Sequence, residues 1–288
     1  MAGAPRRPGR HHVHVSDATP PPPDDVVSYY ETDVEARRLL RGAGALEFAR
    51  TKEIVCRFLG APAVVADIGG AVGHYAEWLA TMGHRVELVE PVPLHVERAR
   101  QRAGEPPRFG VHLADARALP FPDETFDAVL LLGPLYHLGE VEERARALTE
   151  ARRVCKPGAT VFAAAISRFA GLLDAILDRR IDDDDVFANV RAEMQSGRRV
   201  GGARRTSPFP DAYFHLPEEL EAEICGVGFE VVGVYGVEGP GWLHRNLGAA
   251  WEDERMRGRL LVVAQEAEAH PHLRALSPHL LAVARRRR

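Results

Sequence analysis

Short apolar runs alternate with helical patterns through residues 64–166. Each run is four to seven residues long and is bounded by glycine, proline or acidic residues, which is typical of buried strands. Between the runs, apolar positions recur every three or four residues, as on one face of a helix. This rhythm predicts an open α/β sheet. The predicted strands are 64–68, 86–89, 109–113, 126–132 and 160–166, and the predicted helices include 45–59 and 140–154.

The rhythm breaks between Ser167 and Phe214, where an amphipathic helical pattern, an aspartate run and a glycine- and arginine-rich segment follow one another. We expect an insertion there that lies over the carboxyl edge of the sheet as a helical lid. Regular patterns then return as helices at 217–226 and 249–268 and strands at 229–235 and 280–284. The predicted organisation is a disordered leader (1–25), an N-terminal helical cap (26–60), the first part of the core (61–166), the lid insertion (167–215) and the rest of the core (216–288).

A glycine-rich turn joins the first strand to the next helical pattern. The sequence Asp67-Ile68-Gly69-Gly70-Ala71-Val72-Gly73 ends the strand near an acid and then supplies glycines, which allow positive φ angles and close approach of a ligand. The second strand ends in Glu90, 23 residues after Asp67. An acid there can accept two hydrogen bonds from ribose hydroxyls. The alternatives are an ordinary βα loop and a solvated acid at a strand end.

Composition and charge exclude several classes of protein. The chain has 288 residues, of which 45% are apolar and 27% charged, as in soluble globular proteins. Because the net charge is −4 and no basic face carries interleaved aromatic residues, we expect no nucleic-acid partner. No apolar stretch approaches the ~20 residues that span a bilayer. We therefore expect a cytoplasmic protein that does not engage a membrane.

We expect neither a disulfide framework nor a metal site. The three cysteines, Cys56, Cys155 and Cys225, are widely spaced, and each falls in a helical pattern where we expect it to be buried. A histidine cluster at residues 11–14 belongs to the predicted disordered leader. Among the 37 basic residues only Lys52 and Lys156 are lysines, a bias that suggests a GC-rich bacterial source.

Taken together, these motifs resemble those of the class I S-adenosylmethionine-dependent methyltransferases of the small-molecule type. The resemblance is close over residues 45–166 and looser over 215–284, and Ala71 stands where the family usually has glycine. It implies a Rossmann-like, seven-stranded sheet with helices on both faces and an antiparallel final strand. The matching residues are the turn from Asp67 to Gly73, Glu90, the Asp115-Ala116 pair and the segment Arg153-Val154-Cys155-Lys156-Pro157-Gly158.

The resemblance implies S-adenosyl-L-methionine as the cofactor and S-adenosyl-L-homocysteine as its product. It places Asp67 at the amino-acid end of the cofactor, Glu90 at the ribose and Asp115 at the adenine amino group. The chemistry is consistent, because the ammonium, hydroxyl and amine donors of this cofactor need carboxylates and carbonyls. The expected cofactor-binding residues are Asp67, Gly69, Gly70, Ala71, Gly73, Glu90, Asp115, Ala116 and Leu132.

Two other functions compete with methyl transfer. A dinucleotide-binding protein would need the pattern G-x-G-x-x-G, but Ala71 and His74 stand at two of its glycine positions when it starts at Gly69. A protein that binds S-adenosylmethionine without catalysis, as a regulator or partner subunit, would keep the same motifs. The intact cofactor motif and the lid insertion favour an enzyme.

His137 is the candidate catalytic residue, because it follows the fourth strand at the edge where the methyl donor would point. It would take a proton from an acceptor hydroxyl or amine, or it would only shape the pocket. Gly133-Pro134-Leu135-Tyr136 replaces the Asn-Pro-Pro-Tyr type of motif used on base amino groups, so we expect a small-molecule or short-peptide acceptor in bacterial specialised metabolism. The expected acceptor-binding residues are Tyr29, Tyr30, Tyr136, Tyr213 and His215.

Overall fold

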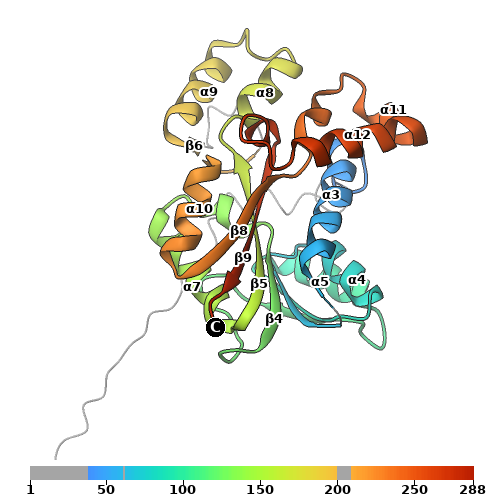
Figure 1. Cartoon of the computed structure of the whole chain (residues 1–288), viewed down its shortest axis with the longest axis vertical. Helices are drawn as coiled ribbons and strands as arrows, with labels where there is room; N and C mark the ends of the chain where they lie inside the picture. The colour runs from blue at the N-terminus through green and yellow to red at the C-terminus, as the bar shows by residue number, and fades with distance from the viewer. Residues whose placement is uncertain (1–37, 61, 200–208) are drawn as a thin grey trace, which may run out of the picture.

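Nine strands form the central sheet of the computed structural model, which describes residues 38–60, 62–199 and 209–288 (Figure 1). The strand order is β3-β2-β1-β4-β5-β7-β6, and β9 pairs with both β5 and β8. The first five strands are parallel. They are β1 (Val64–Ile68), β2 (Arg85–Glu90), β3 (Gly110–Leu113), β4 (Phe126–Leu131) and β5 (Cys155–Ser167).

The chain changes direction across the sheet between β1 and β4. From β1 it runs outward to β2 and β3, and it then returns to place β4 on the other side of β1. Asp67 is therefore flanked by Leu88 of β2 and Leu130 of β4. Ligands of open α/β sheets bind in the crevice at the carboxyl ends of such strands. This topology confirms the predicted Rossmann-like class of fold.

Two late strands complete the core, as the resemblance implied. Strand β9 (His279–Arg286) pairs antiparallel with β5, from Thr160 opposite Arg285 to Ile166 opposite His279. Strand β8 (Phe229–Gly236) forms the next strand along that side and is antiparallel to β9.

The predicted count of seven strands is wrong, because two further strands follow the lid helices. These are β6 (Arg198–Arg199) and β7 (Ala212–His215). Strand β5 is 13 residues long and outlasts β4, whose pairing ends opposite Ala163. Beyond that point Ile166 and Ser167 pair with β7 instead. Strand β7 therefore satisfies backbone groups that the projecting end of β5 would otherwise leave open, and β6 pairs in turn with β7.

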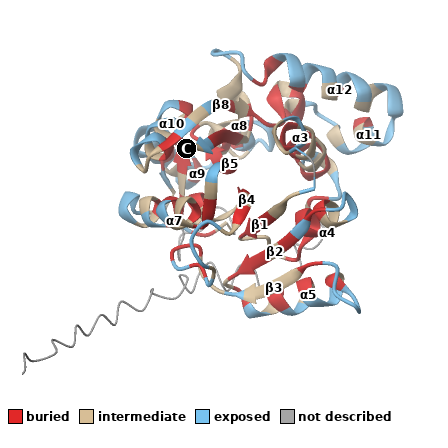
Figure 2. Cartoon of the chain, turned by 60° about the horizontal axis from the view of Figure 1, so that its bottom comes forward, coloured by how far each residue is buried: buried red, intermediate tan, exposed pale blue. Residues whose placement is uncertain are grey.

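Helices cover both faces of the sheet, and the alternation along each strand decides which face a side chain joins. Ala128 and Leu130 of β4 pack with the helices of one face, and Val129 and Leu131 pack with those of the other. The inner strands β1 and β4 are largely buried, whereas β3, most of β8 and the outer sides of the helices are partly or fully exposed (Figure 2). One face carries α3 (Gly42–Phe58), α4 (His74–Thr81) and α5 (Pro93–Ala103), and the other carries α7 (Val141–Val154) and α10 (Pro217–Gly226).

The insertion helices α8 (Ala170–Leu177) and α9 (Asp184–Ser196) lie beyond the carboxyl ends of the parallel strands (Figure 1). The predicted helix at 249–268 is two helices, α11 (Leu247–Glu252) and α12 (Glu254–Ala267). Asp253 separates them, because its carboxylate accepts a hydrogen bond from the Met256 amide at 2.8 Å and starts a new helix. The remaining helical segments are α6 (Pro134–His137), η1 (Gly239–Leu243) and η2 (Arg274–Leu276).

The cysteines differ in part from their prediction. All three are free thiols, but only Cys155 is buried, and it is the first residue of β5 rather than part of a helix. Cys56 and Cys225 are exposed on α3 and α10, because each occupies a solvent-facing position of its helix. In the described part of the chain no helix combines the length and the apolar character needed to cross a membrane.

A buried ion-pair network fastens α3 to α12. The side chain of Arg50 is fully buried; its Nε donates to the Val237 carbonyl at 3.3 Å, and its terminal nitrogens pair with Glu53 and Glu268. Arg57 approaches the same Glu268 carboxylate with contacts of 2.5 and 2.7 Å. Glu268 therefore neutralises two arginines of α3, one of them fully desolvated.

We predict that Glu268→Ala lowers the free energy of unfolding by about 3 kcal/mol, because it leaves the buried Arg50 charge only partly compensated. Urea unfolding followed by circular dichroism measures this change. Glu266→Ala, an exposed substitution in the last turn of α12, is the matched control and should change stability by less than about 0.5 kcal/mol. Similar losses in the two variants would contradict the role given to Glu268.

Candidate functional site

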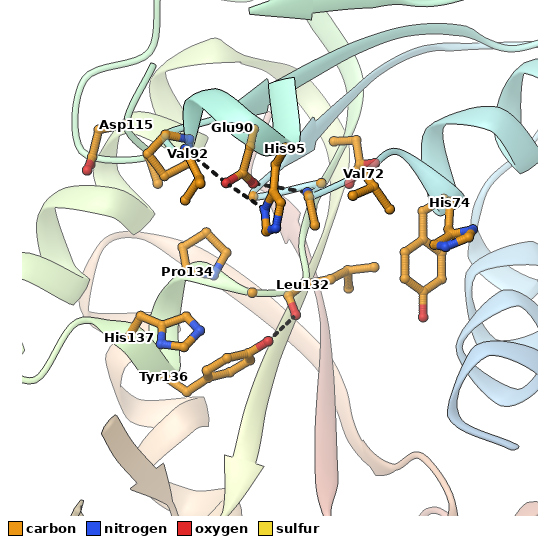
Figure 3. Close-up of a pocket in the computed structure, with 18 of the residues that line it drawn as sticks. Val72, His74, Glu90, Val92, His95, Asp115, Leu132, Pro134, Tyr136 and His137 are labelled. Atoms are coloured by element: carbon orange, nitrogen blue, oxygen red, sulfur yellow. Dashed lines mark hydrogen bonds and ion pairs between the residues drawn. The ribbon is translucent and has the colours of Figure 1, made fainter. Parts of the chain in front are cut away.

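A continuous pocket opens at the carboxyl ends of β1, β2 and β4 (Figure 3). It encloses about 1070 Å³ of space between its walls, including its mouth. Its walls come from the glycine-rich turn, the end of β2, the start of α5, the loop after β3, the segment around α6 and the residues near the start of α3. The pocket therefore lies where the order of the strands reverses, as expected for an open α/β sheet.

The glycine-rich turn is held tightly between β2 and α6. The amides of Gly69 and Gly70 both donate to the Val89 carbonyl, at 2.7 and 3.3 Å. Gly69 has a φ of +71°, and a Cβ on it would lie 2.7 Å from the Pro134 ring. Ala71 also has a positive φ, +46°, which costs an L-residue roughly 1 kcal/mol and explains why glycine is usual there.

Asp67 is a buried carboxylate that faces this pocket. It is 1% exposed, and neither of its oxygens accepts a hydrogen bond from the described residues. Burial, together with the neighbouring Glu90 carboxylate, raises the pKa of Asp67 to about 7. An unsatisfied buried acid of this kind suits a cationic hydrogen-bond donor, such as an ammonium group.

Glu90 is fixed at the end of β2 by backbone amides. Its Oε2 accepts from Ala71 at 3.0 Å, and its Oε1 accepts from Val92 at 3.1 Å. The Nδ1 of His95, from the first turn of α5, lies 3.4 Å from the same Oε1 (Figure 3). The carboxylate is therefore held at the middle of the pocket before any ligand arrives.

Asp115 marks one end of the pocket and is oriented by an arginine. Arg117 donates to the two Asp115 oxygens through its amide, Nε and a terminal nitrogen, each at 2.8 Å. A second terminal nitrogen of Arg117 donates to Glu143 at 2.6 Å. The hydrogen bonds that Arg117 donates to Asp115 are the main reason why the pKa of Arg117 is raised. Ala116 lines the pocket beside this pair.

Tyr136 and His137 form an aromatic wall with a residue of the insertion. The Tyr136 hydroxyl donates to the Leu132 carbonyl at 3.5 Å, and the Tyr136 and His137 rings meet edge to face with centroids 4.6 Å apart. The His137 ring also stacks on Phe209, at 5.7 Å and 26° between planes. Leu132, Tyr136 and His137 all line the pocket.

Tyr213 and His215 lie in a different cluster, under α10, and are absent from the lining of this pocket. His215 is fully buried, and its Nε2 lies 3.3 Å from the carboxylate of Glu223. Arg144 donates hydrogen bonds to the same carboxylate through Nε and a terminal nitrogen. Although burial raises the pKa of Glu223, the hydrogen bonds from His215 and Arg144 outweigh it and lower the pKa to about 2. The expected role of Tyr213 and His215 in acceptor binding stays a prediction.

The structure thus brings most of the expected residues together. Among the expected cofactor residues only Gly73 is missing from the lining; it caps α4 with a φ of +86° and faces Phe109. Tyr29 and Tyr30 lie outside the described residues, as does the expected leader. The residues of the cofactor set that line the pocket are Asp67, Gly69, Gly70, Ala71, Glu90, Asp115, Ala116 and Leu132.

Sequence reasoning missed several lining residues. Arg117 and His95 follow the predicted acids Asp115 and Glu90 closely in the sequence. This short spacing could have indicated that they contact those acids. Arg38 and Glu47 also line the pocket, but they come from the N-terminal helical region and belong to no motif of the core. Only the folded chain places them beside the turn.

Comparison with known proteins shows that the core is similar to methyltransferases. A family model described as a methyltransferase domain matches residues 66–163. A probable tRNA methyltransferase 9B from Mus musculus is 38% identical over 95 residues, which are 33% of this chain and 20% of that protein. A demethylmenaquinone methyltransferase from Thermobifida fusca is 31% identical over 164 residues, which are 55% of this chain and 61% of that protein. The chain therefore matches less than two thirds of the length of these relatives.

A solved structure extends the likeness over the whole fold. The 1,6-didemethyltoxoflavin-N1-methyltransferase of Burkholderia thailandensis, which holds 1,6-didemethyltoxoflavin and S-adenosylhomocysteine, superposes with a TM-score of 0.56 at 18% identity. The superposition covers 92% of this chain and 87% of that one. Residues 66–163 therefore match a methyltransferase domain, and the chain shares the fold of solved S-adenosylmethionine-dependent methyltransferases.

Proposed function

We propose that the protein transfers the methyl group of S-adenosylmethionine to a small-molecule acceptor that presents a flat ring. The observation that supports this most directly is the continuity of the pocket. The same cavity is lined by the expected cofactor residues, from Asp115 through Glu90 to Asp67, and by the aromatic side chains of Tyr136 and His137. A donor and an acceptor can therefore lie in one enclosed space.

The carboxylates of the pocket match the hydrogen-bond donors of the cofactor one by one. The buried Asp67 carboxylate would take the ammonium, the fixed carboxylate of Glu90 would take the ribose hydroxyls, and Asp115 would take the adenine amine. Each of these cofactor groups is a hydrogen-bond donor, and each pocket group is an acceptor. When bound, the cofactor supplies an electrophilic methyl group on a sulfonium.

The acceptor end favours a flat, partly apolar molecule. Tyr136, His137 and Phe209 present rings in mutual contact, and aromatic rings bind other flat rings by offset or edge contacts. Two of the similar proteins are named for demethylmenaquinone and 1,6-didemethyltoxoflavin, whereas the mouse relative is named for tRNA. The net charge of −4 weighs against a nucleic acid as acceptor. A place in bacterial specialised metabolism rests on composition alone and stays a prediction.

His137 has two possible tasks at this end of the pocket. Methyl transfer is an in-line displacement, so holding the acceptor atom against the methyl group supplies much of the rate. A base adds to this only if the acceptor must lose a proton. The stacking of His137 on Phe209 gives it a positioning task in either case. The rival function, cofactor binding without catalysis, predicts binding but no turnover with any acceptor.

Glu90 is the residue expected to bind the ribose hydroxyls of the cofactor. Glu90→Gln should weaken S-adenosylhomocysteine binding by about 2 kcal/mol in titration calorimetry, because charge-assisted hydrogen bonds are lost. Glu87→Gln is the matched control on the same strand; its carboxylate pairs with His112 at 2.8 Å outside the pocket, so affinity should stay unchanged. Equal affinities for wild type and Glu90→Gln would remove Glu90 from the cofactor site.

The second prediction concerns Asp67 and pH. Because its pKa in the free protein is about 7, Asp67 is largely protonated at pH 6 and must lose its proton to pair with an ammonium. Affinity for S-adenosylhomocysteine should therefore rise with pH, by up to about tenfold per unit below pH 7, and level off above it. Calorimetry at pH 6 in buffers of different ionisation enthalpy should show proton release. Asp67→Asn should abolish both effects; an unchanged proton release in that variant would contradict the assignment.

The third prediction separates the two tasks of His137. A general base acts only when unprotonated, so the rate would rise with pH across the range in which histidine titrates, and His137→Gln would lower turnover by about 100-fold or more. A positioning role would leave the shape of the pH–rate curve unchanged in His137→Gln and keep most of the activity. The cofactor affinity, measured by calorimetry, should be nearly equal in both proteins. The rate curves require an acceptor found by screening flat ring compounds.

A further inference from the structure

One buried arginine in the first turn of α7 connects several parts of the fold. Arg144 is 2% exposed, although its guanidinium is always charged. Its Nη1 donates to the carbonyls of Leu138 and Gly139, both at 2.9 Å. Its Nε and Nη2 donate to the Glu223 carboxylate of α10, at 2.9 and 2.6 Å. These contacts use most of the five donors of a guanidinium and hold it in one orientation.

The flat face of the same guanidinium meets the insertion. The Cζ of Arg144 lies 3.9 Å from the centroid of the Tyr213 ring, a cation–π contact that gains strength because the arginine is desolvated. Tyr213 belongs to β7, and His215 of the same strand contacts Glu223. Since α7 and α10 pack side by side (Figure 1), Arg144 joins both helices to the strand at the base of the insertion.

The two carbonyls that Arg144 engages come directly after the aromatic wall. Leu138 and Gly139 follow α6, whose last two residues are Tyr136 and His137. A helix of four residues is a single turn that is not stable by itself, and the carbonyls at its end need donors from elsewhere. Arg144 supplies these donors, so it fixes the end of α6 from which the His137 ring projects.

The other side of α6 rests on the insertion. Tyr136 belongs to a small buried cluster at the base of the insertion, and Phe209 packs against this cluster. Both pocket-lining rings of α6 lie across the pocket from Glu90 (Figure 3). A displacement of α6 would therefore move the aromatic wall and leave the cofactor side in place. The other members of the cluster are Ile166, Ala170, Ala212 and Phe214.

We propose that Arg144 is a positioning residue for methyl transfer: it holds α6 so that Tyr136 and His137 face the acceptor, while Glu223 and Tyr213 hold Arg144. The inference rests on the proposed function, because it takes the aromatic wall as the place of the acceptor. Most of the rate of an in-line displacement comes from placing the acceptor atom correctly, so loss of this support should lower transfer without weakening the cofactor.

The position of the His137 ring can be measured without an acceptor. In ¹H–¹³C spectra of protein labelled at histidine Cε1, the His137 signal is identified by its loss in His137→Gln. The rings of Tyr136 and Phe209 shift this signal, since both contact His137. In Arg144→Met, at the same pH, the signal should move toward that of an unstructured histidine. Arg146→Met, an exposed arginine of the same helix with the same change of charge, should leave it in place.

Two milder variants carry the test if Arg144→Met does not fold. Arg144→Lys keeps the charge but not the fork of donors, so the His137 signal should move in the same direction by less. Glu223→Gln removes the charge that holds the guanidinium and should act in the same way. An unmoved His137 signal in folded Arg144 variants would overturn the positioning role, even if those variants melt at a lower temperature.

Turnover with a flat-ring acceptor found by the screen tests the consequence. Arg144→Met should lower kcat/KM for that acceptor about 10- to 100-fold, whereas its affinity for S-adenosylhomocysteine in calorimetry should match that of Arg146→Met. Equal kcat/KM values in the two variants would overturn the role of Arg144 alone. If the wild-type protein turns over no acceptor, the proposed function fails, and the His137 signal still decides whether Arg144 positions α6.

Discussion

The fold of the glycine-rich turn against the end of β2 is the constraint on which the site depends. Two successive amides, those of Gly69 and Gly70, donate to one carbonyl, that of Val89, and this forces the chain through positive φ angles before α4 can begin. The turn then presents the Ala71 amide to Glu90 and leaves Asp67 buried beneath it without a hydrogen-bond partner among the described residues. A buried carboxylate in this position favours a cationic hydrogen-bond donor as its ligand.

Burial and charge divide the pocket into regions of different chemistry. At one end of the pocket, hydrogen bonds from Arg117 fix the orientation of the Asp115 carboxylate. In the middle, backbone amides fix the carboxylate of Glu90. Asp67 differs from both, because burial and the neighbouring Glu90 carboxylate raise its pKa more than the Ala76 backbone lowers it. The acceptor side carries rings rather than charges, and the insertion contributes Phe209 to it. The glycine-rich motif therefore accounts for the proposed cofactor side, while the proposed acceptor side also depends on a ring from the insertion.

Sequence predicted the parts of the structure that are local and missed those that depend on distant partners. Strand β1, the turn and Glu90 could be predicted, because apolar run, glycines and acid lie close together in the chain. The buried ion pair of Arg50 and Glu268 could not, since its members meet only after α3 and the end of α12 have packed. Strands β6 and β7 were missed because two- and four-residue strands carry no period, and their partner is the projecting end of β5.

A crystal structure of the full chain with S-adenosylhomocysteine would test the central claim most directly. The account predicts the adenine beside Asp115 and Ala116, the ribose hydroxyls on Glu90, and the amino-acid end at Asp67, with the sulfur facing the cavity in front of Tyr136 and His137. A ligand bound in the reverse direction, or bound outside this pocket, would contradict it.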